Sequence, residues 1–188
     1  MDIKKRECLY STKHLNLYQT TYVLDDDIER KWDFVSRKTP TGVVTIICRD
    51  IKTNSFLFIK QPRVTLNMDV ISFPAGLIDK GETPIDAALR ELKEETGYDG
   101  FDLFLIPAVP TSVGLSNEKT YIILCNVDKT KQGQQRLEDT EQIDVYWYSI
   151  SDYFKLITSM FYQKEFILSE GSMLFMSGLL YKEGKFNV

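Results

Sequence analysis

The sequence holds only one histidine among its 188 residues, and this scarcity narrows the chemistry open to the protein. His14 lies in the polar stretch 11–16 without a partner acid at a suggestive spacing, so we interpret it as a surface residue. A histidine-rich zinc site and a Ser-His-Asp triad both need histidine, and neither is expected away from this one position. Any catalysis should therefore come from carboxylates and a metal ion.

Cysteine and long apolar runs are also scarce, and the charge is only mildly negative. The three cysteines, Cys8, Cys48 and Cys125, fit no metal-binding spacing, and the last two lie in apolar runs that predict buried, reduced thiols. Without a signal peptide or an apolar run of membrane-spanning length, we expect a cytoplasmic protein that has no membrane contact. Because the net charge is −4 and no basic stripe is visible, nucleic acid is not an expected partner.

The sequence does hold enough apolar residues, 43% of 188, for one domain with a proper core. Residues 17–24 and 31–37 are predicted to form two strands around an acidic turn, and segment 39–42 then breaks the pattern. We therefore expect residues 1–40 to form a small N-terminal β-hairpin extension, which could serve dimerisation. Residues 41–188 should form the main domain.

The main domain combines several strands with a few helices. Its expected strands are residues 43–48, 55–60, 101–109, 120–127 and 143–149, and its expected C-terminal helices are residues 152–163 and 170–183, the second capped by Ser169. Strands interspersed with helices in this order predict the α/β class, as an α/β/α sandwich on a mixed β-sheet.

A helix over residues 84–96 can be predicted from its boundary residues alone. Thr83 and Pro84 fit the N-cap and the first helical residue, Asp86 completes a capping box, and Gly97 stops the helix. The helical repeat also predicts one apolar stripe facing a core, made of Ile85, Ala88, Leu89 and Leu92.

Glutamates gather on the neighbouring arc of this helix. Glu91, Glu94 and Glu95 lie at i, i+3 and i+4, a spacing at which each like-charged pair costs about 0.2–0.5 kcal/mol. A bound cation would reverse that cost. Because the ligands would all be oxygens, a hard ion is expected, Mg²⁺ or Mn²⁺. Taken alone, the cluster also fits an ordinary solvated helix face, partly neutralised by Arg90 and Lys93.

The wider pattern decides between these two interpretations. The sequence from residue 76 onward resembles the Nudix box, G-x5-E-x7-R-E-U-x-E-E-x-G-U, in which U is apolar. Every fixed position is filled, by Gly76, Glu82, Arg90, Glu91, Glu94, Glu95 and Gly97. Segments 60–63, 73–77 and 107–118 further resemble the ADP-sugar pyrophosphatase branch of that family. The resemblance covers most of the chain between residues 32 and 145.

The resemblance implies the Nudix fold and the hydrolysis of a nucleoside diphosphate linked to a sugar. ADP-ribose is the leading substrate, cleaved by water to AMP and ribose 5-phosphate, with bound cations neutralising the diphosphate. Another substrate, such as a GDP-mannose-type sugar or an oxidised nucleoside diphosphate, stays open, as does a non-catalytic sensor. Members of this branch often form homodimers through their N-terminal strands, so a homodimer is expected.

Carried over position by position, the resemblance also assigns roles within the box. The metal ligands are Glu91 and Glu95, with Glu94 as a further ligand or supporting catalytic group, and the backbone carbonyl of Ala75. Arg90 orients the glutamates by ion pairing, with Glu82 as its expected partner, because a guanidinium fork suits that task. Glu82 and Gly76 are placed at the substrate side of the site.

Three further assignments lie outside the box. The general base of this branch follows the box on a loop, and alignment gives Glu141, with Glu138, Asp139 and a merely solvated loop left open. Arg63 follows a strand and could clamp a phosphate, or be an ordinary surface arginine. Trp32 could stack on a purine, in a homodimer at the partner's site, or simply pack at an interface.

One position departs from the pattern of the branch. Its members usually carry a proline 16 residues after the last box glycine, where this chain has Val113. Because proline fixes φ and shapes a loop, its absence puts the identity of the base or sugar in doubt. The reaction class is unaffected.

Overall fold

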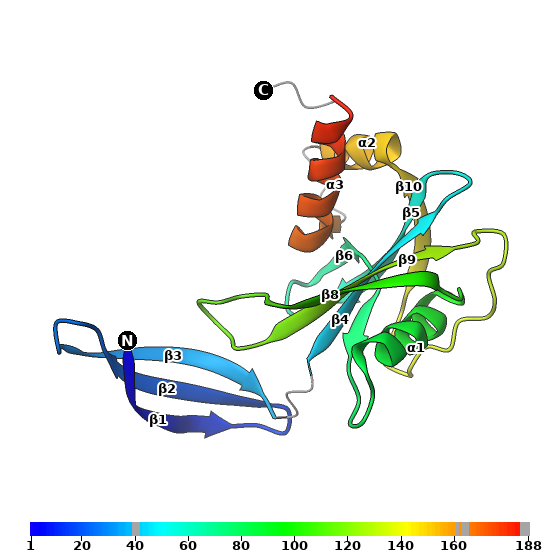
Figure 1. Ribbon diagram of the computed structural model, residues 1–188. Helices are drawn as coiled ribbons and strands as arrows, with labels where there is room; N and C mark the ends of the chain where they lie inside the picture. The colour runs from blue at the N-terminus through cyan, green and yellow to red at the C-terminus, as the bar shows by residue number, and fades with distance from the viewer. Residues whose placement is uncertain (39–41, 161, 163–165, 185–188) are drawn as a thin grey trace.

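The computed structural model describes residues 1–38, 42–160, 162 and 166–184. Within these ranges an antiparallel sheet of three strands lies at one side of the molecule (Figure 1), in the order β1 (Asp2–Ser11), β2 (Leu15–Val23) and β3 (Glu29–Arg37). The predicted N-terminal hairpin is confirmed as β2 and β3. Strand β1 was not predicted, because nearly all of its side chains are exposed and its sequence shows no apolar face.

The second sheet is mixed, and the described part of the chain gives it eight strands. These are β4 (Val43–Asp50), β5 (Ser55–Arg63), β6 (Met68–Ser72), β7 (Ala75–Leu77), β8 (Phe101–Pro110), β9 (Lys119–Val127), β10 (Asp144–Ser149) and β11 (Phe166–Leu168). The order across the sheet is β11-β6-β5-β4-β9-β8, with β10 paired to β5 and β7 paired to β4. Strands β4 and β9 are parallel, as are β6 and β11, whereas the other pairs are antiparallel.

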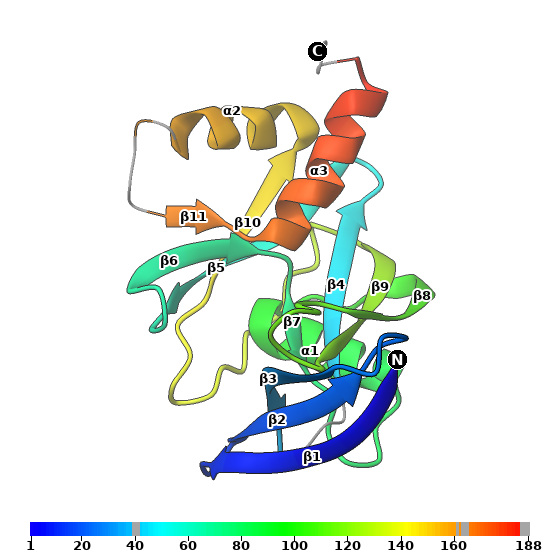
Figure 2. The same ribbon diagram turned by 90° about the vertical axis from the view of Figure 1, so that its left-hand side faces the viewer.

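Helices cover both faces of this sheet (Figures 1 and 2). They are α1 (Pro84–Thr96), α2 (Ile150–Met160) and α3 (Glu170–Lys182). Successive residues of β4 point to opposite faces: Ile46 packs in the same core as Leu92 of α1, and Ile47 packs in a second core with Tyr153 of α2. The predicted α/β/α sandwich on a mixed sheet is therefore confirmed.

The elements predicted for the main domain are present with small shifts at their ends. The five predicted strands are β4, β5, β8, β9 and β10, and the two C-terminal helices are α2 and α3. The predicted end of the first of these helices, at residue 163, lies outside the described residues. Ser169 caps α3 as predicted, its hydroxyl accepting the Ser172 N–H. Strands β6, β7 and β11 were not predicted. They have only five, three and three residues and are too short to show a repeat.

The predictions for two of the cysteines and for the histidine are confirmed. Cys48 and Cys125 are buried and free, at paired positions of β4 and β9 with their Sγ atoms 3.1 Å apart. Burial raises the pKa of the Cys48 thiol well above its usual value. His14 is exposed. None of the described helices has the length and apolarity that crossing a membrane requires.

The loop between β8 and β9, residues 111–118, carries contacts to the N-terminal sheet. Val35 of β3 donates its N–H to the carbonyl of Leu115 at 2.8 Å. The indole N–H of Trp32 is donated to the carbonyl of Gly114 at 3.2 Å. The expected division at residue 40 falls within residues 39–41, which lie outside the described residues, so it stays a prediction.

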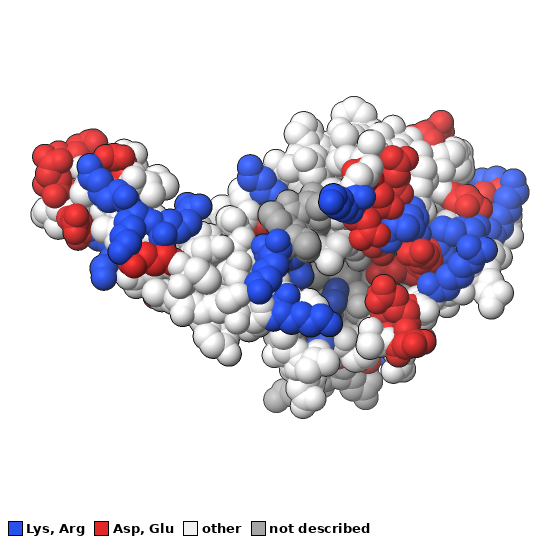
Figure 3. Space-filling model, turned by 90° about the horizontal axis from the view of Figure 1, so that it is seen from below, with Lys and Arg blue, Asp and Glu red and all other residues white. Residues whose placement is uncertain are grey.

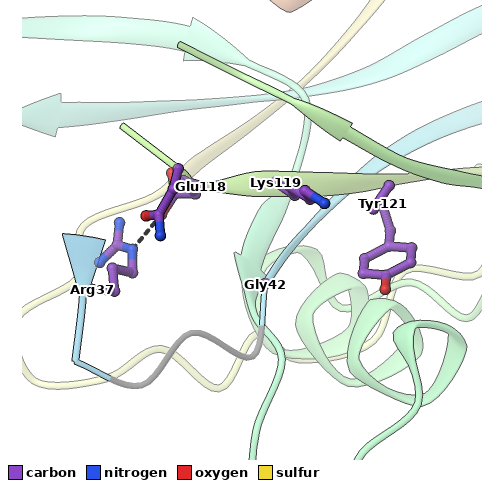
Figure 4. Close-up of a pocket in the computed structure, with 7 residues that line it drawn as sticks. Arg37, Gly42, Glu118, Lys119 and Tyr121 are labelled. Atoms are coloured by element: carbon purple, nitrogen blue, oxygen red, sulfur yellow. Dashed lines mark hydrogen bonds and ion pairs between the residues drawn. The ribbon is translucent and has the colours of Figure 1, made fainter. Parts of the chain in front are cut away.

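A small cavity of about 170 Å³ lies at the same junction (Figure 4). Arg37 at the end of β3 forms an ion pair with Glu118, and Lys119 and Tyr121 of β9 line the cavity beside it. Its lining includes none of the box glutamates. We therefore interpret it as a feature of the contact between the two sheets.

Candidate active site: a carboxylate cleft beside helix α1

Helix α1 begins and ends at the residues that the sequence predicts. The Thr83 hydroxyl accepts the Asp86 N–H, and the Asp86 carboxylate accepts the Thr83 N–H, which completes the capping box. Pro84 occupies the first turn, and Gly97 ends the helix in the left-handed region with φ of 78°. These local signals fix which residues of α1 share a face.

The predicted apolar stripe of α1 is wrong at two positions. Ile85 and Leu89 are 37% and 36% exposed, whereas Ala87, which was not included, is buried. The buried face consists of Ala87, Ala88, Leu92, Glu95 and Thr96. Small alanine side chains allow the helix to lie close to the sheet, and this rotation points the Glu95 carboxylate into the protein.

Gly76 on β7 makes room for the Glu91 carboxylate. A Cβ atom at residue 76 would lie 1.9 Å from Cδ of Glu91 and 2.0 Å from its Oε1, far inside contact distance. Only glycine therefore allows this carboxylate to lie directly against the backbone of β7. The first glycine of the box thus has a steric reason that its sequence position alone does not reveal.

Arg90 binds several carboxylates at once. Its Nε and Nη2 atoms donate to Oε1 and Oε2 of Glu82, at 2.8 and 2.9 Å, which confirms the predicted ion pair. Its Nη1 donates to Glu91 at 2.8 Å and to Glu94 at 3.1 Å. The hydrogen bonds from Arg90 lower the pKa of Glu82 to about 2, and those to Glu82 raise the pKa of Arg90. Arg90 is thus held as a fixed positive charge between these glutamates.

Glu95 is the most deeply buried carboxylate of the group, with 3% of its surface exposed. Its Oε2 accepts the N–H of Ala75 at 3.1 Å. Burial, followed by the negative charge of Glu91, raises the pKa of Glu95 to about 8, against the smaller opposing effects of the Ala75 N–H and Arg63. Burial also raises the pKa of Glu91 despite its bond to Arg90. The ionised forms of both carboxylates are therefore disfavoured in this environment, and a nearby positive charge would stabilise them.

Arg90, Glu91 and Glu94 border a cleft of about 360 Å³, whereas Glu82 and the buried Glu95 are not among its lining residues. It is lined by Ala75, Gly76, Leu77, Asp79, Arg90, Glu91, Glu94, Arg136, Leu137, Glu138 and Glu141. In the view of Figure 3, acidic side chains gather on the main body where α1 lies. The loop after β9 thus brings Glu138 and Glu141 to the box residues. Asp139, the third acid left open for the base, is not among the lining residues.

The donor set fits a divalent cation. Its atoms are carboxylate and carbonyl oxygens, which hard cations prefer. The raised pKa values of Glu91 and Glu95, caused first by burial and also by the negative charge of neighbouring glutamates, are what a bound cation would reverse. In the conformation observed, no three acidic, His or Cys side chains of the described residues converge as a ready-made site, and Glu91 instead accepts Arg90. Arg90 donates to Oε1 of Glu91 only, so the other oxygen of this carboxylate can still bind a cation.

Trp32 and Arg63 are not brought into this cleft. Trp32 is 52% exposed and lines a separate cavity of about 550 Å³, together with Phe34 and Val113. This cavity shares no lining residue with the carboxylate cleft. Arg63 ends β5 and lines another hollow of about 340 Å³, although its charge is near enough to lower the pKa of Glu95. Their assigned roles therefore stay predictions.

Arg136 and Asp79 line the cleft but were not predicted to do so. Arg136 is exposed, and its backbone N–H donates to the carbonyl of Glu94 at 2.8 Å. Nothing in the local sequence separates Arg136 from an ordinary loop arginine. Asp79 could have been found from its place inside the box, three residues before Glu82, to which it donates its N–H at 2.9 Å.

The raised pKa of Glu95 predicts a pH dependence of stability in metal-free protein. Between about pH 4.5 and 8 the folded chain keeps a proton on Glu95 that the unfolded chain releases. The folded state then binds more protons, so the free energy of unfolding falls as pH rises, by up to about 1.4 kcal/mol per pH unit. Thermal unfolding with a chelator at pH 5–8 should show this slope, and Glu95→Gln should flatten it. An equal slope in both proteins would contradict the assignment.

Comparison with known proteins adds to this geometry. Residues 38–168 match the NUDIX domain family. The chain is 31% identical to an ADP-ribose pyrophosphatase of Bacillus subtilis (strain 168), over 82% of this chain and 81% of that protein. It is 32% identical to an ADP-sugar pyrophosphatase of Mus musculus, over 71% of this chain and 65% of the relative. It is 36% identical to an ADP-ribose pyrophosphatase of Saccharomyces cerevisiae (strain ATCC 204508 / S288c), over 71% and 63%. The chain thus spans slightly less than two thirds of the mouse and yeast proteins.

Proposed function

Because the chain belongs to the NUDIX family, we propose that it is a hydrolase of the ADP-sugar pyrophosphatase type. Its substrate would be a nucleoside diphosphate linked to a sugar, with ADP-ribose preferred and AMP and ribose 5-phosphate as products. The observation that carries the proposal is the cleft in which Arg90, Glu91 and Glu94 of the box meet two acids of a separate loop, with Glu95 buried on the same helix. A sensor that only binds nucleotide would not need this arrangement.

Nudix hydrolases generally need divalent metal ions, and we propose Mg²⁺ or Mn²⁺ for this chain. Glu91, Glu95, Glu94 and the carbonyl of Ala75 would hold the ion. When bound, the ion would neutralise the diphosphate and lower the pKa of a coordinated water molecule. Glu82 supports this set indirectly, because both of its oxygens accept hydrogen bonds from Arg90.

Glu141 is the proposed general base. A water oxygen forms a bond to one phosphorus while the bridging P–O bond breaks, and the carboxylate accepts the proton that the water releases. Glu141 lines the cleft, and its negative charge contributes to the raised pKa values of Glu91 and Glu95 after their burial. Glu138 also lines the cleft and donates its backbone N–H to Glu141 at 3.0 Å. It is the alternative base, whereas the placement of Asp139 gives that residue no support.

The nucleobase of the substrate would be bound by the N-terminal sheet of a second copy of this chain. Trp32 offers an exposed aromatic face beside a cavity that is also lined by apolar residues of all three N-terminal strands. That cavity is distinct from the carboxylate cleft of the same chain, so stacking by Trp32 fits a homodimer in which it serves the partner's site. Arg63 would clamp a phosphate from the end of β5.

A panel of nucleoside diphosphate derivatives tests the proposed function. The protein is incubated with ADP-ribose, GDP-mannose or an oxidised nucleoside diphosphate, with Mg²⁺, with Mn²⁺ or with a chelator, and released monophosphate is measured. We expect ADP-ribose to be hydrolysed fastest, and only with metal present. Binding of nucleotide without release of monophosphate would contradict the enzyme and favour the sensor.

Val113 favours one alternative within this proposal, namely a substrate with another sugar or nucleobase. Val113 is 79% exposed on the loop that lines the Trp32 cavity, where branch members usually carry proline. If another sugar or base is preferred in the panel, this loop is the part of the structure that differs, while the same carboxylates perform the hydrolysis.

A further inference from the structure

A short polar segment caps the C-terminal end of α1. The last carbonyls of a helix lack partners within the helix and usually accept from water or a local cap. Here the backbone N–H of Arg136 donates to the carbonyl of Glu94, and the N–H of Gly133 donates to that of Gly97, both at 2.8 Å. Residues 132–136, which follow β9 by five residues, therefore lie directly against the helix that carries the box glutamates.

Two glutamine side chains complete this contact. Gln132 donates its Nε2 to the carbonyl of Thr96 at 3.1 Å. Gln135 donates its Nε2 to the carbonyl of Glu95 at 2.6 Å and to the carbonyl of Ile143 at 3.2 Å. A side-chain amide has two N–H donors, so both donors of Gln135 are used.

The two hydrogen bonds of Gln135 connect it to two different parts of the fold. Glu95 lies on α1 and carries the most deeply buried carboxylate of the box. Ile143 is the buried residue just before β10. The amide of Gln135 therefore pins both ends of segment 136–142 at one point, at the end of the helix. Glu138 and Glu141, the two loop acids that line the cleft, both belong to that segment.

We propose that Gln135 is a positioning residue, which holds the loop acids at a fixed place relative to the helix glutamates. This inference rests on the proposed hydrolase function for its kinetic consequence only. The two carbonyls belong to buried residues, Glu95 and Ile143, which are 3% and 5% exposed. Water that replaced the Gln135 amide would bond each carbonyl separately and would not tie the two ends of the segment together. The expected consequence is kinetic, because displacing a catalytic group by about 1 Å can cost a hundredfold in rate.

Gln135→Met is the test variant, since methionine keeps the length of the side chain and removes both donors. Gln134→Met is its matched control, because Gln134 is the exposed neighbour on the same segment. Amide hydrogen exchange over residues 136–143 should become about tenfold faster in Gln135→Met and stay unchanged in the control. Equal exchange in the two variants would overturn the proposal, whatever the substrate.

Kinetics then separate positioning from a general structural effect. With the nucleotide that the wild type hydrolyses fastest, Gln135→Met should lower kcat about ten- to a hundredfold, with KM changed by less than about twofold. The same substitution is repeated in a chain in which Glu138, Asp139 and Glu141 are all amides. There it should lower the residual rate no further, because the groups it positions are gone.

Each outcome decides a separate question. A wild-type kcat in Gln135→Met, or an equal loss in the amide background, would overturn the positioning role. If the wild type hydrolyses no nucleotide at all, the proposed function fails. The exchange experiment then still decides whether Gln135 holds the loop to α1.

Discussion

Glu95→Gln is expected to lower kcat for the best substrate by about a thousandfold or more while the protein keeps its fold. The substitution removes the charge of a proposed metal ligand. Losing one such ligand forfeits several kcal/mol of transition-state stabilisation, and a thousandfold corresponds to about 4 kcal/mol. Turnover is measured at saturating Mg²⁺ or Mn²⁺, so that weaker metal binding alone does not determine the result.

The fold should tolerate this change, because glutamine has the shape of glutamate and its carbonyl can still accept the Ala75 N–H. It also removes a buried negative charge next to Glu91. In chelator at pH 8, the variant should therefore unfold at a Tm no lower than that of the wild type. Glu170→Gln, on the exposed first turn of α3, is the control for loss of one charge. Near-wild-type turnover of Glu95→Gln would remove Glu95 from the metal ligands.

Gly97→Ala is expected to cost about 2–4 kcal/mol of stability. Residue 97 has φ of 78°, a region where alanine pays about 1 kcal/mol. Its new Cβ would also lie 2.3 Å from the backbone carbonyl oxygen of Gly133, and a backbone atom cannot move aside cheaply. For a domain of this size, Tm should fall by about 5–15 °C in thermal unfolding.

Gly81→Ala separates the steric effect from the conformational one. Gly81 also has positive φ, 94°, but a Cβ there would meet nothing within 4 Å. It should lose only about 1 kcal/mol. If the two variants are equally stable, the segment 132–136 does not press against the end of α1 as observed. Gly97→Ala should also lower kcat, because moving Gly133 displaces the chain that leads to the loop acids.

The sequence was most informative where a structure depends on neighbours in the chain. Helix α1 could be predicted with its end residues, because Thr83, Asp86 and Gly97 act on the backbone within a few residues of themselves. The rotation of that helix was partly wrong. Which side of α1 is buried depends on how closely the sheet approaches Ala87, and a periodic pattern holds no information about that distance.

Short strands were missed for a related reason. Strand β11 is only three residues long and forms by parallel pairing with β6, from which it is separated by most of the main domain. Strand β7 likewise depends on antiparallel pairing with β4. Strand β1 pairs with β2 along its length but has no buried face. Such strands are stabilised by partners that local propensity does not identify.

In the candidate site, too, the residues that depend on local sequence were predicted, and those that depend on the tertiary fold were not. The box gave the glutamates of α1 directly, and alignment gave Glu141. That Glu138 lines the same cleft while Asp139 does not is a result of how the loop folds. The segment Lys131-Gln-Gly-Gln-Gln135 reads as an ordinary polar loop. Its contacts become visible only once the end of α1 is placed beside it.

The loop of residues 111–118 connects the Trp32 cavity to the N-terminal sheet. Its backbone bonds to β3 through the carbonyl of Leu115, and it holds the Trp32 indole through the carbonyl of Gly114. Val113 is adjacent to Gly114 and close to Leu115, so a substitution at Val113 that shifts the loop should also shift β3, the strand that carries Trp32. Substitutions that move this loop should therefore change the Trp32 cavity and the position of the N-terminal sheet together. Chimeras that exchange specificity between relatives should therefore transplant the loop and the sheet together.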